Sequence, residues 1–506
     1  TKKANKEHAS IGAHTGTKEM GTNFYYSSGR QGKVSVKASG GIEDVRKEVS
    51  GYYNKTKGYD TSSSNMYGPR RFLNLGFDYA FDANRGLALD LNFMREQFTS
   101  NSSEGTDKGV YNYDNNRSDY ALTYYGKDNK NDYNLRMYYN TLKKSNVTNE
   151  NNAITDFDHT SYDTLVFEGK NSMKLNDKNT MTYGAEWTTT NMRGTRFGGG
   201  GDNKYSETFA GITKAGSEKD VDTYAAYLQD EWKITDKWLL IPAVRFDHHN
   251  AFGSHTSPKI GTTYSFSDNS RFKVNYGKSF RAPTVYELYS TMDKRMGMMN
   301  VQVLGNPDLK PEKATNFDIG FEAEQGKWSG KLGYYHNEID NLIDSDMFYR
   351  GYVPGVGMVV KSKYYNVGEA EISGAEAEVG YNFNDNWNVK ATYNYTDAKD
   401  KTANARLNNR ARQNGVVQLS YTDNAELPFT ATLWSKWYVD YLYKVSSNVN
   451  TYTFNTFNFV ADKQITKNLH VYAGVDNIFD KTLPYDENHS YTIDGRTWRV
   501  GAEMTF

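Results

Sequence analysis

The sequence predicts an all-β fold, a transmembrane antiparallel β-barrel of about 22 strands. Two observations predict it. Aromatic residues make up 15% of the 506 residues, with 41 Tyr and 25 Phe, although the mean hydropathy is only -0.81. Apolar and polar residues also alternate along the chain with a period of two, which is typical of strands with one apolar and one polar face. Such a chain uses many aromatic residues without a conventional apolar core.

The alternating pattern begins near His8–His14 and continues to the end of the chain. Clear examples are the segments 71–81, 86–93, 375–383 and 387–395. A crossing strand needs about 10 residues, and a spacing of roughly 23 residues between alternating segments gives about 22 strands, an even number. A bilayer accepts a sheet only if its edges pair, so we expect the sheet to close into a barrel.

The last residues, Trp498–Phe506, predict the closing strand. Trp498, Val500, Ala502, Met504 and Phe506 would face lipid, while the residues between them would face the lumen. This strand must pair with the first one to close the sheet. Tyr and Phe residues at strand ends would form the aromatic girdles of an outer-membrane barrel.

Connections of two lengths are expected between the strands. Short turns are predicted at Ala80–Gly86, Ile234–Trp238 and Phe383–Trp387. Long polar loops are predicted at Thr99–Asp119 and Asn191–Asp220. Short turns at one end and long loops at the other are typical of outer-membrane barrels.

Other classes of protein fit less well. The longest apolar stretches, such as Trp238–Val244, fall short of the roughly 20 residues of a membrane-spanning helix. The 60 basic and 61 acidic residues are balanced, so no nucleic-acid partner is expected. The chain has no Cys, which excludes disulfides and thiolate metal sites. A soluble propeller would show a repeat of about 40–50 residues, which is absent, and no catalytic motif indicates an enzyme.

Several segments resemble TonB-dependent outer-membrane transporters and follow the order of that family. They are YAAYLQDEWKITDKWLLIPAVRFD (224–247), YGKSFRAPTVYELY (276–289), GNPDLKPEKATNFDIGFE (305–322), YYNVGEAEISGAEAEVGYNF (364–383) and VYAGVDNIFDKTL (471–483). The resemblance implies an outer-membrane location and active uptake of a scarce, bulky nutrient. Most of these motifs read as structural, because Pro283, Pro307 and Pro311 end strands by removing a ladder donor.

Members of that family carry a plug domain and a TonB-binding segment before the barrel. Here the alternating pattern follows a polar lead of residues 1–8, and residues 1–506 are expected to form one barrel domain. Natural barrels of this size keep the lumen filled. We therefore expect a separate plug protein, or a plug cut away from this chain, to fill the lumen and to contact the TonB complex, while outer-membrane lipid surrounds the wall.

The resemblance allows several substrates. Haem receptors of the family usually carry a His between the two central motifs, whereas Thr284–Gly305 holds a methionine cluster, Met292, Met296, Met298 and Met299. A methionine cluster more often forms an adaptable apolar surface than an iron site. Siderophore receptors hold anionic chelates with Arg and aromatic side chains. The candidates for that role are Arg193, Arg196, Tyr349 and Arg350.

Cobalamin receptors of the family bind calcium through Asp-rich loops early in the barrel. Two acidic segments, Tyr111–Tyr120 and Ile154–Asp163, provide candidate oxygen ligands. The candidate calcium ligands are Asp107, Asp114, Asp119, Asp156, Asp158 and Asp163. Cobalamin is thus the first expected substrate, and an iron siderophore or haem is the alternative within transport.

The alternative from a different class of function is a passive large-pore channel, or a surface receptor or adhesin. No covalently bound cofactor is expected.

Overall fold

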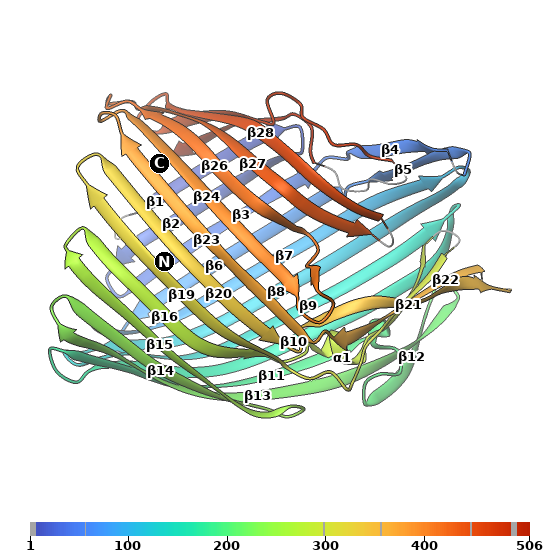
Figure 1. Ribbon diagram of the computed structural model, residues 1–506, viewed down its shortest axis with the longest axis horizontal. Coiled ribbons are helices and arrows are strands. Elements are labelled where there is room, and N and C mark those ends of the chain that lie inside the picture. Colours follow the sequence, from blue (N-terminus) through green and yellow to red (C-terminus); the bar gives the residue numbers. More distant parts are fainter. Residues whose placement is uncertain (1–6, 56, 297–298, 355–356, 446–447, 487–492) are drawn as a thin grey trace.

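The computed structural model describes residues 7–55, 57–296, 299–354, 357–445, 448–486 and 493–506. Across these residues, 22 strands form a closed antiparallel barrel (Figure 1). The wall strands, in spatial order, are β1 (His8–Gly16), β2 (Glu19–Gln31), β3 (Val34–Val45), β6 (Gly68–Ala80), β7 (Arg85–Glu104), β8 (Asp107–Lys127), β9 (Asn131–Glu150), β10 (Ala153–Lys174), β11 (Asn179–Gly194), β13 (Ile212–Thr235), β14 (Trp238–His249), β15 (Gly253–Ser267), β16 (Ser270–Arg281), β19 (Glu312–Gln325), β20 (Trp328–Asp340), β23 (Glu369–Asn382), β24 (Trp387–Asp400), β26 (Arg410–Thr422), β27 (Phe429–Val445), β28 (Asn448–Gln464), β29 (Leu469–Asp476) and β30 (Thr497–Thr505). The predicted fold is confirmed. No helix in the described segments is long and apolar enough to cross a membrane.

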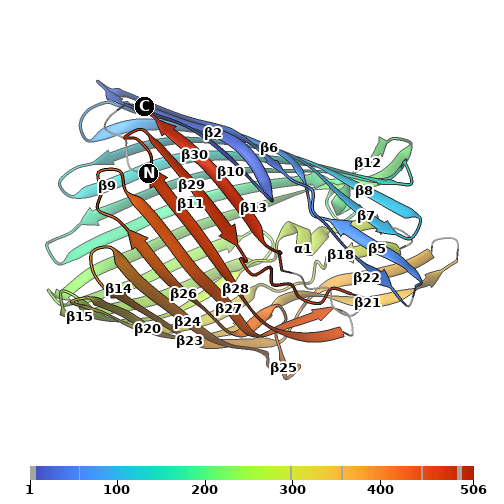
Figure 2. The ribbon, with the colours of Figure 1, turned by 90° about the horizontal axis from the view of Figure 1, so that it is seen from above.

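The barrel closes where the first strand meets the last. β1 pairs with β30 in a register that runs from Ser10 opposite Thr505 to Gly16 opposite Arg499. The Phe506 backbone N–H also donates to the Ala9 carbonyl oxygen over 2.8 Å. Figure 2 shows β30 running beside the first strands of the chain. The predicted closing strand is therefore confirmed.

The outward face of the wall carries the apolar side chains. One row of cross-strand neighbours passes from Leu89 through Leu122, Met137 and Phe167 to Trp187, on β7 to β11. The rings of Phe167 and Trp187 stack with their centroids 5.6 Å apart. On the closing strand, Trp498 is 48% exposed and Met504 45% exposed. Large apolar side chains with this exposure are stable only against lipid, as the alternation predicted.

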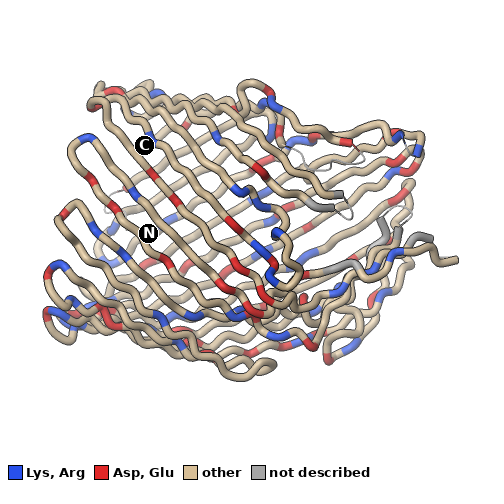
Figure 3. Tube along the Cα trace, viewed as in Figure 1, with Lys and Arg blue, Asp and Glu red and all other residues tan. Residues whose placement is uncertain are grey.

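The lumen face of the wall is charged. Arg70 bridges Glu43 and Glu96 over 3.2 and 3.0 Å, and Glu378 lies between Lys331 and Lys390. Figure 3 shows acidic and basic residues spread along the strands of the wall. Opposite charges on neighbouring strands pair in this way when the face they share is wet.

The turns and loops differ in part from the prediction. The three predicted short turns are confirmed between β6 and β7, β13 and β14, and β23 and β24. The predicted loop Thr99–Asp119 is wrong, because β7 and β8 pair continuously until Glu104 meets Asp107 at a tight turn with Gly105 at φ +61°. Apolar alternation stops where lipid stops, but the backbone ladder continues beyond it with mostly polar residues on both faces.

Smaller elements gather at the long-loop end of the barrel. They are the hairpin β4 (Val49–Asn54) and β5 (Tyr59–Ser64), the 3-10 turn η1 (Thr195–Phe197), β12 (Asn203–Phe209), α1 (Val285–Tyr289), β25 (Ala405–Arg406) and a four-stranded sheet of β17 (Thr291–Met296), β18 (Met299–Leu304), β22 (Gly357–Asn366) and β21 (Ile343–Val353). Part of the predicted loop Asn191–Asp220 therefore forms η1, β12 and the start of β13. The largest fully buried apolar side chains, Phe157, Phe197 and Leu288, also lie at this end.

Candidate functional site

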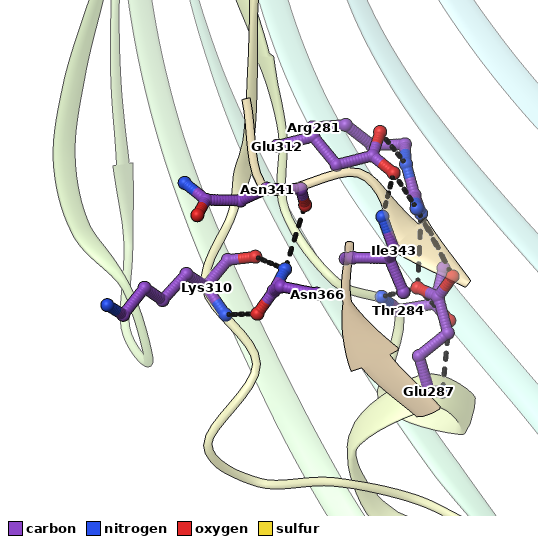
Figure 4. A network of polar contacts seen from close by, with 8 residues as sticks. All are labelled: Arg281, Thr284, Glu287, Lys310, Glu312, Asn341, Ile343 and Asn366. Carbon is purple, nitrogen blue, oxygen red and sulfur yellow. Dashed lines mark hydrogen bonds and ion pairs between the residues drawn. The ribbon is translucent and has the colours of Figure 1, made fainter. Parts of the chain in front are cut away.

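A network of polar contacts fixes the base of the largest loops (Figure 4). Arg281, the last residue of β16, donates from Nε and Nη2 to the Glu312 carboxylate, with both distances 2.7 Å, and from Nη1 to Glu287 over 3.0 Å. Glu312 also accepts the backbone N–H of Ile343 over 2.8 Å. One guanidinium thus joins the ends of two wall strands to α1 and to the start of β21. The motifs at 276–289 and 305–322 meet here, which gives them a structural role.

The short helix α1 is held by its own cap as well as by Arg281. The Thr284 hydroxyl accepts the Glu287 backbone N–H over 3.2 Å, and Glu287 accepts the Thr284 backbone N–H over 2.7 Å. This reciprocal arrangement is a capping box. The hydrogen bonds that Arg281 donates to Glu312 and Glu287 raise the pKa of its guanidinium, so its charge is permanent. A second anchor is Asn366, whose side chain binds both backbone groups of Lys310 and the Asn341 carbonyl oxygen.

We expect Arg281→Gln to loosen α1. The change removes both ion pairs, and because the Arg281 side chain is 43% exposed, the loss is modest, about 1–2 kcal/mol. Amide hydrogen exchange of Val285–Tyr289 should accelerate about tenfold. The matched control is Arg271→Gln on the same strand, which removes a 2.6 Å bond to Glu322 at the short-turn end and should leave exchange in α1 unchanged. Equal exchange in both variants would contradict the role of Arg281.

A buried ionic cluster lies where β10 projects past the end of β11. Lys214 donates to Asp156 over 3.0 Å and to Asp158 over 3.1 Å, and the side chain of Asp158 is only 4% exposed. The Thr195 hydroxyl donates to Asp158 over 3.0 Å. Arg196 approaches the same carboxylate over 3.5 Å. Burial raises the pKa of Asp156, and the Lys214 ammonium opposes that shift. We call these five residues the ionic cluster.

Three tyrosines lie beside this cluster on the lumen side. Tyr286 of α1 makes an edge-to-face contact with Tyr364, centroids 6.2 Å apart, and Tyr162 of β10 makes one with Phe197. The Tyr286 hydroxyl donates to the Met292 sulfur over 3.6 Å. Burial raises the pKa of Tyr286, and the nearby charge of Arg196 opposes the shift. Tyr162, Tyr286 and Tyr364 with Arg196 and Met292 form the tyrosine cluster.

The structure brings together only some of the predicted substrate contacts. Met292 and Arg196 both belong to the tyrosine cluster, since each lies beside Tyr286. Arg193 instead lies over the ring of Tyr205, 4.7 Å from its centroid, and Tyr349 and Arg350 are exposed on β21. Met298 lies outside the described residues, and the backbones of Met296 and Met299 belong to β17 and β18.

The prediction that Tyr111–Tyr120 and Ile154–Asp163 are acidic loops is wrong, because these segments belong to the strands β8 and β10. Alternation places Asp114 and Asp119 on opposite faces of β8, and only Asp156 and Asp158 come together. The other four contact different side chains: Asp107 with Asn151, Asp114 with Arg95, Asp119 with Tyr138 and Asn140, and Asp163 with Tyr139. Within the described ranges, no three His, Asp or Glu side chains group as a metal ion requires. A calcium site stays a prediction.

Sequence reasoning missed Lys214 and the three tyrosines. Tyr286 and Tyr364 fall inside the motifs at 276–289 and 364–383, which were interpreted as structural. A hollow of about 970 Å³ lies elsewhere, in the wall at the seam around Ala13, Ala473 and Ala502. It is not a counterpart of the tyrosine cluster, because it lies where the first and last strands meet and shares no lining residue with that cluster.

Comparison of the sequence with models of known families agrees with the closed barrel described above. Residues 9–478 match the family model described as "TonB dependent receptor-like, beta-barrel". The chain belongs to this family. TonB-dependent receptor barrels lie in the outer membrane, so the apolar outward face contacts outer-membrane lipid and the long-loop end is extracellular.

Curated relatives of this TonB-dependent receptor barrel include two receptors with different ligands in their names. The ferrienterobactin receptor of Escherichia coli is 25% identical over 377 residues, which cover 65% of this chain and 49% of the relative. The vitamin B12 transporter of Photobacterium profundum is 27% identical over 321 residues, which cover 61% and 47%. The chain spans about half the length of the curated relatives it matches.

Solved structures show the same fold. A ferric enterobactin receptor mutant from Pseudomonas aeruginosa superposes with a TM-score of 0.79 at 17% identity, covering 100% of this chain and 81% of that one. The siderophore receptor PirA of Acinetobacter baumannii superposes with a TM-score of 0.77 at 18% identity, with the same coverage. At these identities the likeness concerns the fold alone.

Proposed function

We propose that this barrel takes part in active, TonB-dependent uptake of an anionic, aromatic iron chelate of the ferric catecholate class. The observation that carries the proposal is the tyrosine cluster. It presents phenol rings, a guanidinium and a thioether on the lumen side, beneath the extracellular loops. Within the described residues, the Arg196 Nε has no hydrogen-bond acceptor of suitable geometry, although it is buried. Aromatic rings can stack on catechol rings, and a guanidinium attracts an anionic chelate.

Cobalamin is the second candidate. The 27% identity to a vitamin B12 transporter favours it, as does the close pair Asp156 and Asp158. That pair already holds an ammonium, so a calcium ion would have to displace Lys214. In the tyrosine cluster, Arg196 lies 3.5 Å from Asp158, but its Nε makes no hydrogen bond in the described residues and the tyrosine rings hold no cation, and this places the iron chelate first.

Direct binding measurements separate the two candidates. The folded protein in detergent is titrated with ferric enterobactin, a ferric hydroxamate and cyanocobalamin, each with and without Ca²⁺, and ligand binding is followed by quenching of intrinsic fluorescence. We expect ferric enterobactin to bind most tightly, independently of Ca²⁺. Tight cyanocobalamin binding that requires Ca²⁺ would replace the proposal with the second candidate. Binding of none of the three would contradict both.

The variant Arg196→Gln tests the named site. Removing the guanidinium should weaken ferric enterobactin binding about tenfold to a hundredfold, because a charge-assisted bond to a chelate is worth roughly 1.5–3 kcal/mol. The control Arg350→Gln removes an exposed charge on β21 and should change binding little. Unchanged affinity in Arg196→Gln would remove the tyrosine cluster from the proposal.

Transport further requires that the wide lumen be filled. We propose that the charged lumen wall contacts a plug, either a separate chain or another part of the same polypeptide, which conveys the pull of TonB. Co-purification of the barrel from native outer membranes distinguishes these arrangements. A second protein bound inside the barrel supports a separate plug. Large steady conductance of the complete native assembly in planar bilayers would instead indicate a passive pore.

A further inference from the structure

Methionine supplies all the side-chain sulfur of this protein, which has 14 Met and no Cys. Several exposed methionines, among them Met20, Met137 and Met504, occupy lipid-facing positions of the wall. Met66 lies instead between β5 and β6 at the extracellular end and is 44% exposed. Met292, the second residue of β17, is half-buried in the tyrosine cluster beneath the extracellular loops. A dissolved oxidant therefore reaches Met66 and Met292 from water.

The sulfur of Met292 lies among hydrogen-bond donors. The Tyr286 hydroxyl donates to it over 3.6 Å. The guanidinium of Arg196 also lies beside Tyr286, since its charge opposes the rise that burial causes in the pKa of that phenol. The Arg196 Nε lies 3.5 Å from Asp158 but makes no hydrogen bond among the described residues. A thioether is only a weak acceptor, so the surroundings of Met292 offer two donors to a stronger one.

Oxidation of this sulfur by hydrogen peroxide needs no other reactant. A sulfur lone pair attacks one peroxide oxygen, and the S–O bond forms as the O–O bond breaks. The departing oxygen takes up the proton of the attacked oxygen and leaves as water. Sulfur loses two electrons and the peroxide gains them, which gives methionine sulfoxide. The sulfoxide oxygen carries partial negative charge and is a much stronger acceptor than the thioether.

We propose that Met292 is a site of reversible oxidation by peroxides, and that its sulfoxide blocks binding of the anionic chelate to the tyrosine cluster. This regulation rests on the function proposed above for the cluster. The new oxygen would accept hydrogen bonds from Tyr286 and Arg196, so the guanidinium would be less available to the chelate. Its negative charge would also repel an anion. Reductases return methionine sulfoxide to methionine, so the block can be reversed.

Peptide mass spectrometry tests the oxidation step without any chelate. Folded protein in detergent is treated with hydrogen peroxide, and the oxygen added at each methionine is followed with time. We expect Met292 to oxidise at least as fast as the more exposed Met66, because its two donors stabilise the charge that develops on the peroxide oxygens. The variant Tyr286→Phe should slow oxidation of Met292 severalfold and leave Met66 unchanged. Slow oxidation of Met292, or an unchanged rate in Tyr286→Phe, would overturn the proposal.

Binding of ferric enterobactin before and after oxidation tests the block. The oxidised protein should bind about tenfold more weakly, as expected for the loss of about one charge-assisted hydrogen bond. Treatment with methionine sulfoxide reductases should restore the affinity. In Met292→Leu, peroxide should change the affinity little, whatever its starting value. The matched control Met66→Leu should lose affinity on oxidation as the unaltered protein does, and the gel shift of folded barrels checks that each variant folds.

The outcomes separate this regulation from the proposed function. If the unoxidised protein binds ferric enterobactin and complete oxidation of Met292 leaves the affinity unchanged, Met292 only packs in the cluster and the block is refuted. An equal loss of affinity in Met292→Leu would assign the effect to another methionine and would also refute it. If the unoxidised protein does not bind ferric enterobactin, the proposed function fails and the block fails with it, while the oxidation rates still show whether Met292 is a site of oxidation.

Discussion

Leu122→Arg is expected to destabilise the barrel by about 2–4 kcal/mol, because it places a cation at the middle of the lipid-facing band. Leu122 is 42% exposed and belongs to the central apolar row between Leu89 and Met137. An arginine there must leave lipid or draw water into the bilayer. Reversible urea unfolding in lipid vesicles, followed by fluorescence of the eight tryptophans, measures the change in free energy of unfolding.

The neighbouring position supplies the control for this prediction. Thr123 follows Leu122 on β8, so alternation turns it into the lumen beside Arg136. Thr123→Arg should cost less than about 1 kcal/mol, because an arginine remains hydrated there. If both variants lost the same stability, the assignment of lipid-facing and lumen-facing rows on β8 would be wrong.

Lys214→Met should open the extracellular loops. Lys214 is 14% exposed and neutralises Asp156 and Asp158, whose side chains are 11% and 4% exposed. Removing one partner from a buried ionic group costs about 3–5 kcal/mol. The loss is local, so faster amide hydrogen exchange in β12 and η1 measures it better than global unfolding. Because these segments adjoin the tyrosine cluster, binding of ferric enterobactin should also weaken.

The effect of Lys214→Met depends on pH. Burial raises the pKa of Asp156, and Lys214 opposes that shift. A carboxyl group with a raised pKa in the folded state destabilises the fold above that pKa, and the penalty disappears as the pH falls through it. The variant should therefore be more destabilised at about pH 8 than at about pH 5. Adding Asp156→Asn and Asp158→Asn to the Lys214→Met variant should restore part of the protection of β12 and η1 against amide hydrogen exchange. Failure to restore it would argue against the ionic cluster.

Alternation was sufficient to predict the wall of the barrel. It identified the closing strand at Trp498–Phe506 and the outward faces of β6 and β7, because lipid on one side and water on the other select residues directly by polarity. It failed at Thr99–Asp119, where both faces of the β7 and β8 extension meet water. Polarity no longer distinguishes a strand from a loop there, and only the backbone ladder does.

The candidate site was predicted only in part. Arg196 and Met292 were named from their residue types, and both reach the tyrosine cluster. Tyr286, Tyr364 and Lys214 were missed because the chain has many tyrosines and lysines, and the neighbouring sequence does not distinguish these three from the others. Their partners lie far away in the chain, as with Lys214 and Asp156, which are 58 residues apart.

The sequence by itself determined the closed barrel, its outward and lumen faces, its short turns and the family, since each depends on local polarity or on short motifs. Only the tertiary structure decided which loop residues meet. It assembled the Arg281 network from four segments, gathered the tyrosine cluster under the loops, and brought Lys214 to Asp156 and Asp158. The physical reason is strand register: it fixes which distant residues become neighbours, and it depends on the pairing of the whole wall.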